Sequence, residues 1–93
     1  METTLPKSSP VRVGDAVMFF DPYGEWHSAL VTEAHNAGHE EQYPNASINL
    51  VYVSDKADER DQYGRQIKRY TSVVHKSNQS AHGMYWIRLI ELT

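Results

Sequence analysis

The sequence has no cysteine among its 93 residues. Disulfide bonds, thiolate metal ligands and a cysteine nucleophile are therefore excluded. Long hydrophobic runs are also missing, and none approaches the roughly 20 apolar residues of a membrane-spanning helix. The opening METTLPKSSP lacks the apolar core of a secretory signal. We therefore expect a soluble chain.

Positive charge is missing from a long segment. Residues 13–55 contain no lysine or arginine, whereas residues 56–93 carry most of the basic side chains. Such asymmetry is typical of complementary surfaces. These surfaces either pair within one domain or meet between copies, and the sequence leaves both explanations open. The acidic residues of the first segment are Asp15, Asp21, Glu25, Glu33, Glu40, Glu41 and Asp55.

What is present indicates one small all-β domain. Hydrophobic residues make up 40% of the chain, which suffices for a single core in a domain of this size. Alternating apolar segments separated by turn residues predict five strands. In INLVYV both faces are apolar, which indicates a central strand. The expected strands cover residues 16–20, 25–34, 47–53, 65–75 and 84–92, and a helical turn would fit the charged connection at 55–64.

Two segments resemble each other, DPYGEWHSALVTEAH at 21–35 and DQYGRQIKRYTSVVH at 61–75. In each, the aspartate is expected to cap a turn and the glycine to take a positive φ. The tyrosine rings, Tyr23 and Tyr63, are expected to lie over the end of the barrel. The strands that follow differ in their chemistry. We therefore interpret the repeat as one turn and strand used twice rather than as a duplicated site.

Residues 1–12 are expected to form an extended arm, followed by one domain over 13–93. Pro6 and Pro10 flank a polar stretch, and Leu5 is its large apolar side chain. Such a segment buries too little surface to order itself. We expect a neighbouring molecule, or packing on its own domain, to hold it.

The first strands resemble the start of an SH3-like barrel of the KOW or Tudor kind. The resemblance rests on Val13-Gly14-Asp15, followed by Val17, Gly24, Trp26, Ala29 and Val31. It implies a small five-stranded SH3-like barrel. The charged connection before Gly64 departs from that pattern, so the ligands of those families are not carried over. The rest of the chain is similar to small uncharacterised proteins of tailed bacteriophages, which implies a virion location, with the cytoplasm as the alternative.

Catalytic and metal chemistry find little support. No phosphate-binding glycine loop or paired catalytic motif is present, and we expect neither enzyme activity nor a cofactor. A metal site from His35, His39 and His75 would require the ends of the two similar segments to meet. We expect no metal there and interpret these histidines as surface or hydrogen-bonded side chains.

Two binding functions remain. Basic residues cluster over 60–76 with Tyr63 and Tyr70 among them, a composition suited to phosphate tracking and base stacking. It predicts a nucleic-acid surface formed by Arg65, Lys68, Arg69, Tyr70 and Lys76. The preferred hypothesis is a structural subunit, a capsid decoration, cement or head–tail protein that binds a protein lattice and forms a homo-oligomer. A phage-encoded binder of a host factor is a third alternative. The predicted protein contacts are Leu5, Pro6, Pro10, Tyr23, Trp26, Tyr63 and Tyr85.

Overall fold

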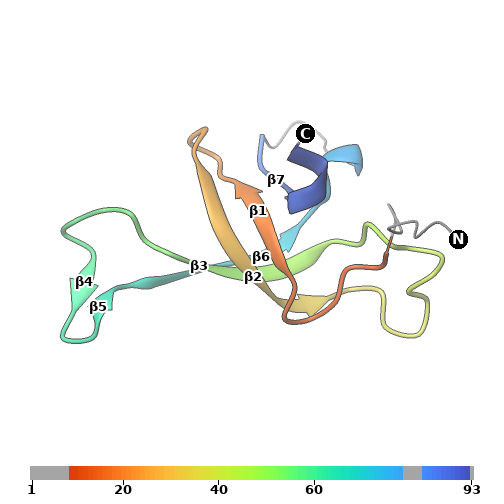
Figure 1. Ribbon diagram of the computed structural model, residues 1–93, viewed down its shortest axis with the longest axis horizontal. Helices are drawn as coiled ribbons and strands as arrows, with labels where there is room; N and C mark the ends of the chain where they lie inside the picture. Colours follow the sequence, from red (N-terminus) through yellow and green to blue (C-terminus); the bar gives the residue numbers. More distant parts are fainter. Residues whose placement is uncertain (1–8, 79–82, 93) are drawn as a thin grey trace, which may run out of the picture.

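A computed structural model describes residues 9–78 and 83–92, and its centre is a five-stranded antiparallel sheet (Figure 1). The strand order is β6-β3-β2-β1-β7. Leu5 and Pro6 of the predicted arm lie outside the described residues. The strands are β1 (Ala16–Phe20), β2 (Trp26–Ala34), β3 (Ile48–Val53), β6 (Ile67–Val73) and β7 (Tyr85–Arg88).

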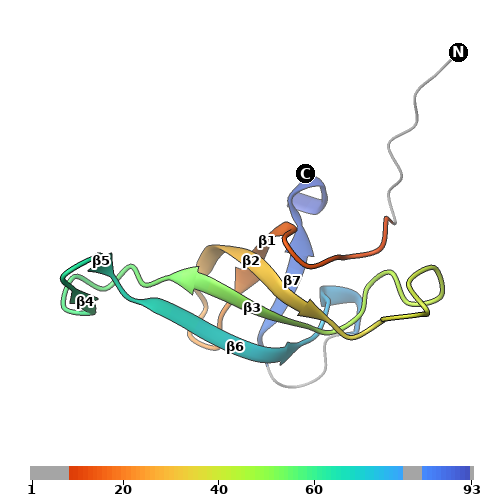
Figure 2. The same ribbon diagram turned by 90° about the horizontal axis from the view of Figure 1, so that it is seen from below.

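A second, two-stranded element stands at the far end of β3 and β6. It is the hairpin of β4 (Arg60–Asp61) and β5 (Gly64–Arg65), and Figure 2 shows β3 and β6 running side by side toward it. The helical turn expected within 55–64 is therefore wrong. The Asp-x-Tyr-Gly turn is followed at once by a paired residue, and this favours a hairpin over a helix.

The inner face of the sheet holds the core. Alternation places Val17 and Phe19 of β1 on this face, as the sequence predicts, together with every second residue of β2 as far as Val31 and every second residue of β3. Trp86 of β7 closes the core and donates its indole N–H to the Ala46 carbonyl over 3.1 Å. The other apolar side chains of this buried cluster are Val11, Ala29, Val31, Ile48, Leu50, Tyr52 and Val73. Ile87 of β7 is also buried, at 6% exposure, but does not belong to this cluster.

The described end of the predicted arm belongs to this core. Val11 is only 1% exposed, and its N–H donates to the Pro44 carbonyl over 3.1 Å. The domain therefore packs on residues that lie N-terminal to position 13.

The last strand is shorter than expected. β7 ends at Arg88, and the 3-10 turn η2 (Leu89–Leu92) follows. The Glu91 side chain accepts a hydrogen bond from the Arg88 N–H over 2.7 Å, which turns the chain back on itself. A shorter 3-10 turn, η1 (Lys76–Asn78), follows β6. No α-helix occurs in the described ranges, so the all-β prediction is confirmed.

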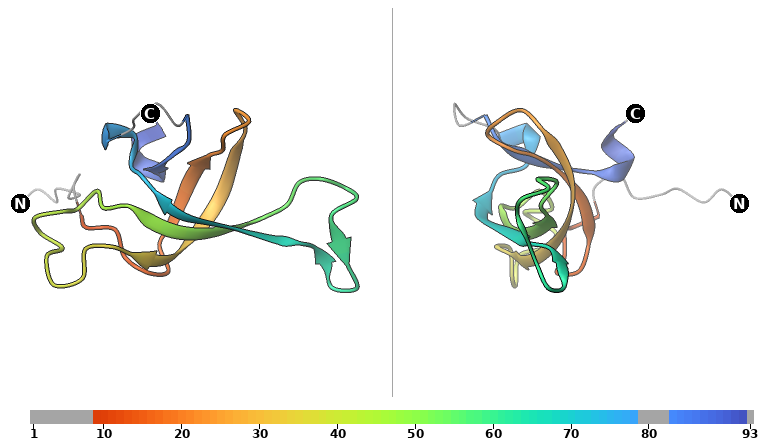
Figure 3. Two further views of the ribbon diagram at one scale, coloured as in Figure 1. Left: turned by 180° about the vertical axis from the view of Figure 1, so that it is seen from behind. Right: turned by 90° about the vertical axis from the view of Figure 1, so that its left-hand side faces the viewer.

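The sheet curls, and Figure 3 shows the curl end-on. Its edge strands β6 and β7 are joined by one isolated bridge, between His75 and Trp86, and by the hydrogen bond from the Trp86 N–H to the Val74 carbonyl. Within residues 9–78 and 83–92 no ladder of hydrogen bonds connects the two edges. The established fold is a curled five-stranded sheet with an added hairpin.

Candidate functional site

The two Asp-x-Tyr-Gly turns share their local hydrogen bonds. Asp21 accepts the N–H of Tyr23 over 2.9 Å, and Asp61 accepts the N–H of Tyr63 over 2.8 Å. Gly24 and Gly64 have φ values of 86° and 123°, a region that favours glycine. The expected caps are therefore confirmed. Both tyrosine rings are exposed, so the expectation that they cover the barrel end is wrong.

The two turns differ in what surrounds the aspartate. Asp61 is exposed, whereas Asp21 is 5% exposed and lies 2.8 Å from the Nε2 atom of buried His27. Burial raises the pKa of Asp21, but the hydrogen bonds from the Glu25 N–H, His27 and the Tyr23 N–H outweigh this effect. The net result is a lowered pKa. Asp21 is thus a charged group inside the sheet, held by three donors.

A cleft of about 310 Å³ opens above this pair at one end of the sheet. Tyr52 stacks on the His27 ring with centroids 4.1 Å apart, and burial with the neighbouring Tyr70 and Asp21 raises its pKa to about 12. Its hydroxyl therefore stays protonated at neutral pH. Other groups in the lining are Asp55, Lys56, Glu59 and Lys68.

Two pairs of charged groups in the cleft are bound to each other, Asp21 with His27 and Glu59 with Lys68. Glu59 accepts hydrogen bonds from the Ser54 hydroxyl and from the Lys68 ammonium, and these lower its pKa. No buried side-chain nitrogen or oxygen among the described residues lacks a partner. The hydrogen bonds of the cleft therefore support its own architecture, in the manner of a satisfied polar network.

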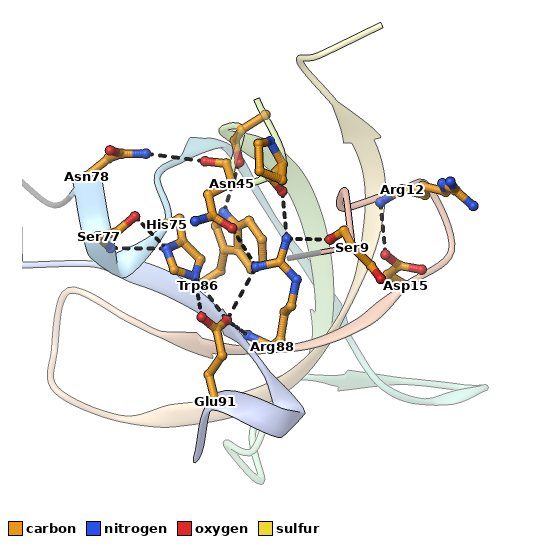
Figure 4. Close-up of polar contacts among 12 residues, drawn as sticks. Ser9, Arg12, Asp15, Asn45, His75, Ser77, Asn78, Trp86, Arg88 and Glu91 are labelled. Carbon is orange, nitrogen blue, oxygen red and sulfur yellow. Dashed lines mark hydrogen bonds and ion pairs between the residues drawn. The ribbon is translucent and has the colours of Figure 1, made fainter. Parts of the chain in front are cut away.

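A second polar network ties the C-terminal turn to the domain (Figure 4). The Ser77 N–H donates to Nδ1 of His75, so the ring proton sits on Nε2, which donates to the Glu91 carboxylate over 3.0 Å. Arg88 donates to the carbonyls of Ser9 and Pro44 over 2.8 and 2.6 Å. This network joins the N-terminal segment, the 35–47 loop and η2.

The three histidines considered for a metal have separate partners. His35 bonds Asn49, His39 bonds Gln42, and His75 bonds Glu91 and Ser77. Among the described residues, no group of three histidine, aspartate or glutamate side chains is arranged to hold a metal.

The basic residues of 65–76 do not form one stripe. Lys68 and Tyr70 face the cleft and the core, where Lys68 bonds Glu59 and Tyr70 packs on Phe19. Arg69 is exposed on the opposite face. Arg65 reaches the Ser54 carbonyl, and Lys76 lies on η1 over the Tyr85 ring.

The predicted protein contacts are brought together only in part. Trp26 and Tyr85 meet across Phe20, with ring centroids 4.9 and 5.1 Å from the Phe20 ring. Tyr23 and Tyr63 lie apart from them on two separate turns. Pro10 is half-buried beside Val11.

Trp26 and Tyr85 belong to a larger apolar surface, which we call the outer face. Cross-strand register places three rows on the side of the sheet away from the core. Trp26, Leu30, Ile67 and Val53 are 42%, 52%, 53% and 56% exposed. Each row runs across neighbouring strands in the direction from β7 to β6. The first row contains Tyr85, Phe20 and Trp26, and the second contains Ile87, Met18, Ser28, Val53 and Ile67. The third row contains Ala16, Leu30, Val51 and Arg69.

Part of the outer face forms a groove of about 240 Å³, lined mainly by Leu30, Val51, Val53 and Ile67. The sequence analysis missed these four residues as contacts. The signal was the second apolar face of INLVYV, which was interpreted as a sign of a central strand. β3 is indeed paired on both sides, by β2 and β6. Central position alone does not cover its outer face.

The ion pairs show whether the acidic segment 13–55 and the basic segment 56–93 pair with each other in one chain. The lysine and arginine pairs found among the described residues are Lys68–Glu59 and Arg88–Glu91, and both lie within the basic segment. No ion pair in the described ranges joins an acidic side chain of 13–55 to a lysine or arginine of 56–93.

Comparison with known proteins finds no matching family model, no significantly similar curated protein and no significantly similar solved structure. Among the residues that the structure describes, no helix has the length and apolar character to cross a membrane. The proposals below therefore rest on the geometry of this chain.

Proposed function

We propose that this chain is a non-enzymatic interaction domain, an open SH3-like barrel that binds protein through its outer face. The observation that carries the proposal is the apolar outer face, with Trp26, Leu30, Val53 and Ile67 each about half exposed. Exposed apolar patches rimmed by polar residues mark interaction sites. Aromatic side chains such as Trp26 are enriched at the centre of such sites.

The polar groups of the chain support the same proposal. In the cleft, Asp21 is held by two backbone N–H groups and by His27, and Glu59 by Ser54 and Lys68. A catalytic group needs a free position for substrate. The bonds of these side chains are instead used to hold the turn and the ends of β3 and β6.

The setting that we propose is a virion accessory subunit, a decoration, cement or head–tail protein within a lattice of subunits. The phage-like character of the sequence supports this proposal, and so does a surface suited to contacts with other proteins. We rank nucleic-acid binding below it, because Lys68 and Tyr70 face away from Arg69 and so do not present one basic strand.

The experiment is capture of partners, a second copy of the chain included, by immobilised chain from extracts of its source. Leu30→Glu places a charge on the outer face at an exposed position, whereas Lys68→Ala alters the cleft. We expect wild type and the cleft variant to retain the same specific proteins and the outer-face variant to lose them. Retention that depends on Lys68 rather than on Leu30 would contradict the proposal.

A further inference from the structure

We propose that two copies of this chain pack outer face against outer face as a two-fold symmetric dimer. The aromatic cluster of each copy (Phe20, Trp26 and Tyr85) fits the groove of the other (Leu30, Val51, Val53 and Ile67). This inference rests on the proposed function and names the partner of the outer face as a second copy.

The outer face has the composition of a covered sheet surface. An antiparallel sheet with water on one side alternates apolar and polar residues, with the polar residues in water. Here the outer positions of β1 are Ala16, Met18 and Phe20, and β3 contributes Val51 and Val53. Sheets with two apolar faces are found where a second layer packs about 10 Å away.

The exposed apolar area is a substantial part of what a dimer interface requires. Full burial removes about 60–120 Å² from a Val, Leu or Ile side chain and about 150–250 Å² from an aromatic one. With their exposed fractions, Trp26, Leu30, Val53 and Ile67 leave about 160–300 Å² of apolar surface in water. A standard interface buries about 800 Å² per partner, a little over half of it apolar. These four side chains therefore supply about one-third to two-thirds of the apolar area of such an interface.

The edge strands of the sheet are protected against pairing with another chain, which leaves the outer face as the surface for association. The edge strand β6 carries Lys68 and Arg69, and a bulge at Ser72, where φ is 54°, interrupts its ladder with β3. Charges and bulges of this kind oppose pairing between edges. At the other edge, β7 is only four residues long and is bridged to His75. On the outer face, Arg69 lies at the end of one row and Lys76 lies over the Tyr85 ring, whereas the lining of the groove contains no charged side chain.

The face is also complementary to itself. An aromatic row and an aliphatic groove lie on either side of the Met18–Ser28 pair. A two-fold axis near that pair exchanges the two, as an isologous interface requires. The same rotation brings the acidic β1–β2 turn of one copy, with Glu25, toward Arg69 of the other. This explains why the two charge segments form no ion pair within the described part of one chain.

The first test is the mass of the purified chain at micromolar concentration by sedimentation velocity. We expect twice the chain mass of 10.7 kDa for the wild type. Leu30→Glu is expected to weaken dimerisation at least tenfold, whereas Tyr63→Glu, at a more exposed position on the β4–β5 hairpin, leaves it unchanged. Circular dichroism checks that each variant is folded. A wild-type monomer at 100 µM, or a dimer indifferent to Leu30→Glu, overturns the inference.

The second test uses the absence of cysteine. Ser28→Cys places one thiol near the proposed axis, so mild oxidation is expected to give a disulfide-linked dimer in high yield. Tyr63→Cys is the matched control and should give only the slow cross-linking of random collisions. Equal yields from the two variants would overturn the dimer. If the purified chain is monomeric while Leu30→Glu still abolishes partner capture, the dimer fails and the proposed function stands.

Discussion

Replacing Asp21 with alanine should destabilise the domain far more than the same change at Asp61. The two residues occupy the same place in the two Asp-x-Tyr-Gly turns, so each serves as the control for the other. Asp21→Ala removes the acceptor of the Tyr23 and Glu25 N–H groups and leaves buried His27 without its carboxylate. Asp61→Ala removes one exposed cap.

The magnitudes follow from burial. An unsatisfied buried group costs about 1–3 kcal/mol, and three donors lose their partner at Asp21, so the expected cost is about 3 kcal/mol. Loss of an exposed cap costs about 0.5–1 kcal/mol. In a domain of this size 1 kcal/mol shifts Tm by about 4–8 °C. We therefore expect Tm to fall by about 12–24 °C for Asp21→Ala and by a few degrees for Asp61→Ala.

Urea and thermal unfolding followed by circular dichroism measure both costs. The pH dependence adds an independent check. The pKa of Asp21 is lower in the folded chain, so its contribution is present above the unfolded pKa near 4 and is lost as pH falls through the folded pKa. The difference between wild type and Asp21→Ala should shrink below about pH 4. Equal costs for the two alanine variants at pH 7 would refute the importance that we give to the buried pair.

Other features of the domain give further expectations. Arg88→Ala should cost about 2–4 kcal/mol in urea unfolding, because carbonyl groups lose a charged donor and Trp86 loses a cation 5.1 Å from its ring, whereas exposed Arg69→Ala should stay within 0.5 kcal/mol. Removal of residues 1–11 should lower Tm markedly, because Val11 is in the core. Burial raises the pKa of Glu91, but hydrogen bonds from His75 and the Arg88 N–H outweigh this effect, and the net pKa is lowered. The ionised Glu91 carboxylate therefore stabilises the fold above its unfolded pKa, and this stabilisation is lost as pH falls through its folded pKa. Glu91→Gln should therefore be less stable than wild type at pH 7 and should approach it near pH 3, as unfolding midpoints measured across that range will show.

The five main strands were predictable because their signal is local. In β2, His27, Ala29 and Val31 alternate with Trp26, Ser28 and Leu30, and the structure buries the first set. The end of the chain was not predictable in this way. MYWIRLIEL has the composition of a strand, but the bonds from Glu91 to the Arg88 N–H and to distant His75 turn it into η2 after Arg88.

The buried pair was within reach of the sequence. Once alternation places His27 on the inner face, the histidine needs a polar partner there. Asp21 lies six residues before it, across a turn that brings the two strands together. The sequence analysis gave Asp21 and Asp61 the same role because their local pattern is the same. The two aspartates differ in the strand that follows each turn. The strand after Asp21 carries the inward-facing His27, whereas the strand after Asp61 belongs to a short exposed hairpin.

The residues of the outer face contribute little to the stability of the fold, so the fold alone does not explain why they are apolar. Trp26, Leu30, Val53 and Ile67 keep about half of their surface in water, so each adds only part of the stabilisation that a buried side chain gives. Polar residues at these positions would satisfy the same strand pairing and the same core. Apolar side chains there gain their full stabilisation only when a second surface covers them. The bound state that we propose therefore explains the sequence of the outer face better than the isolated fold does.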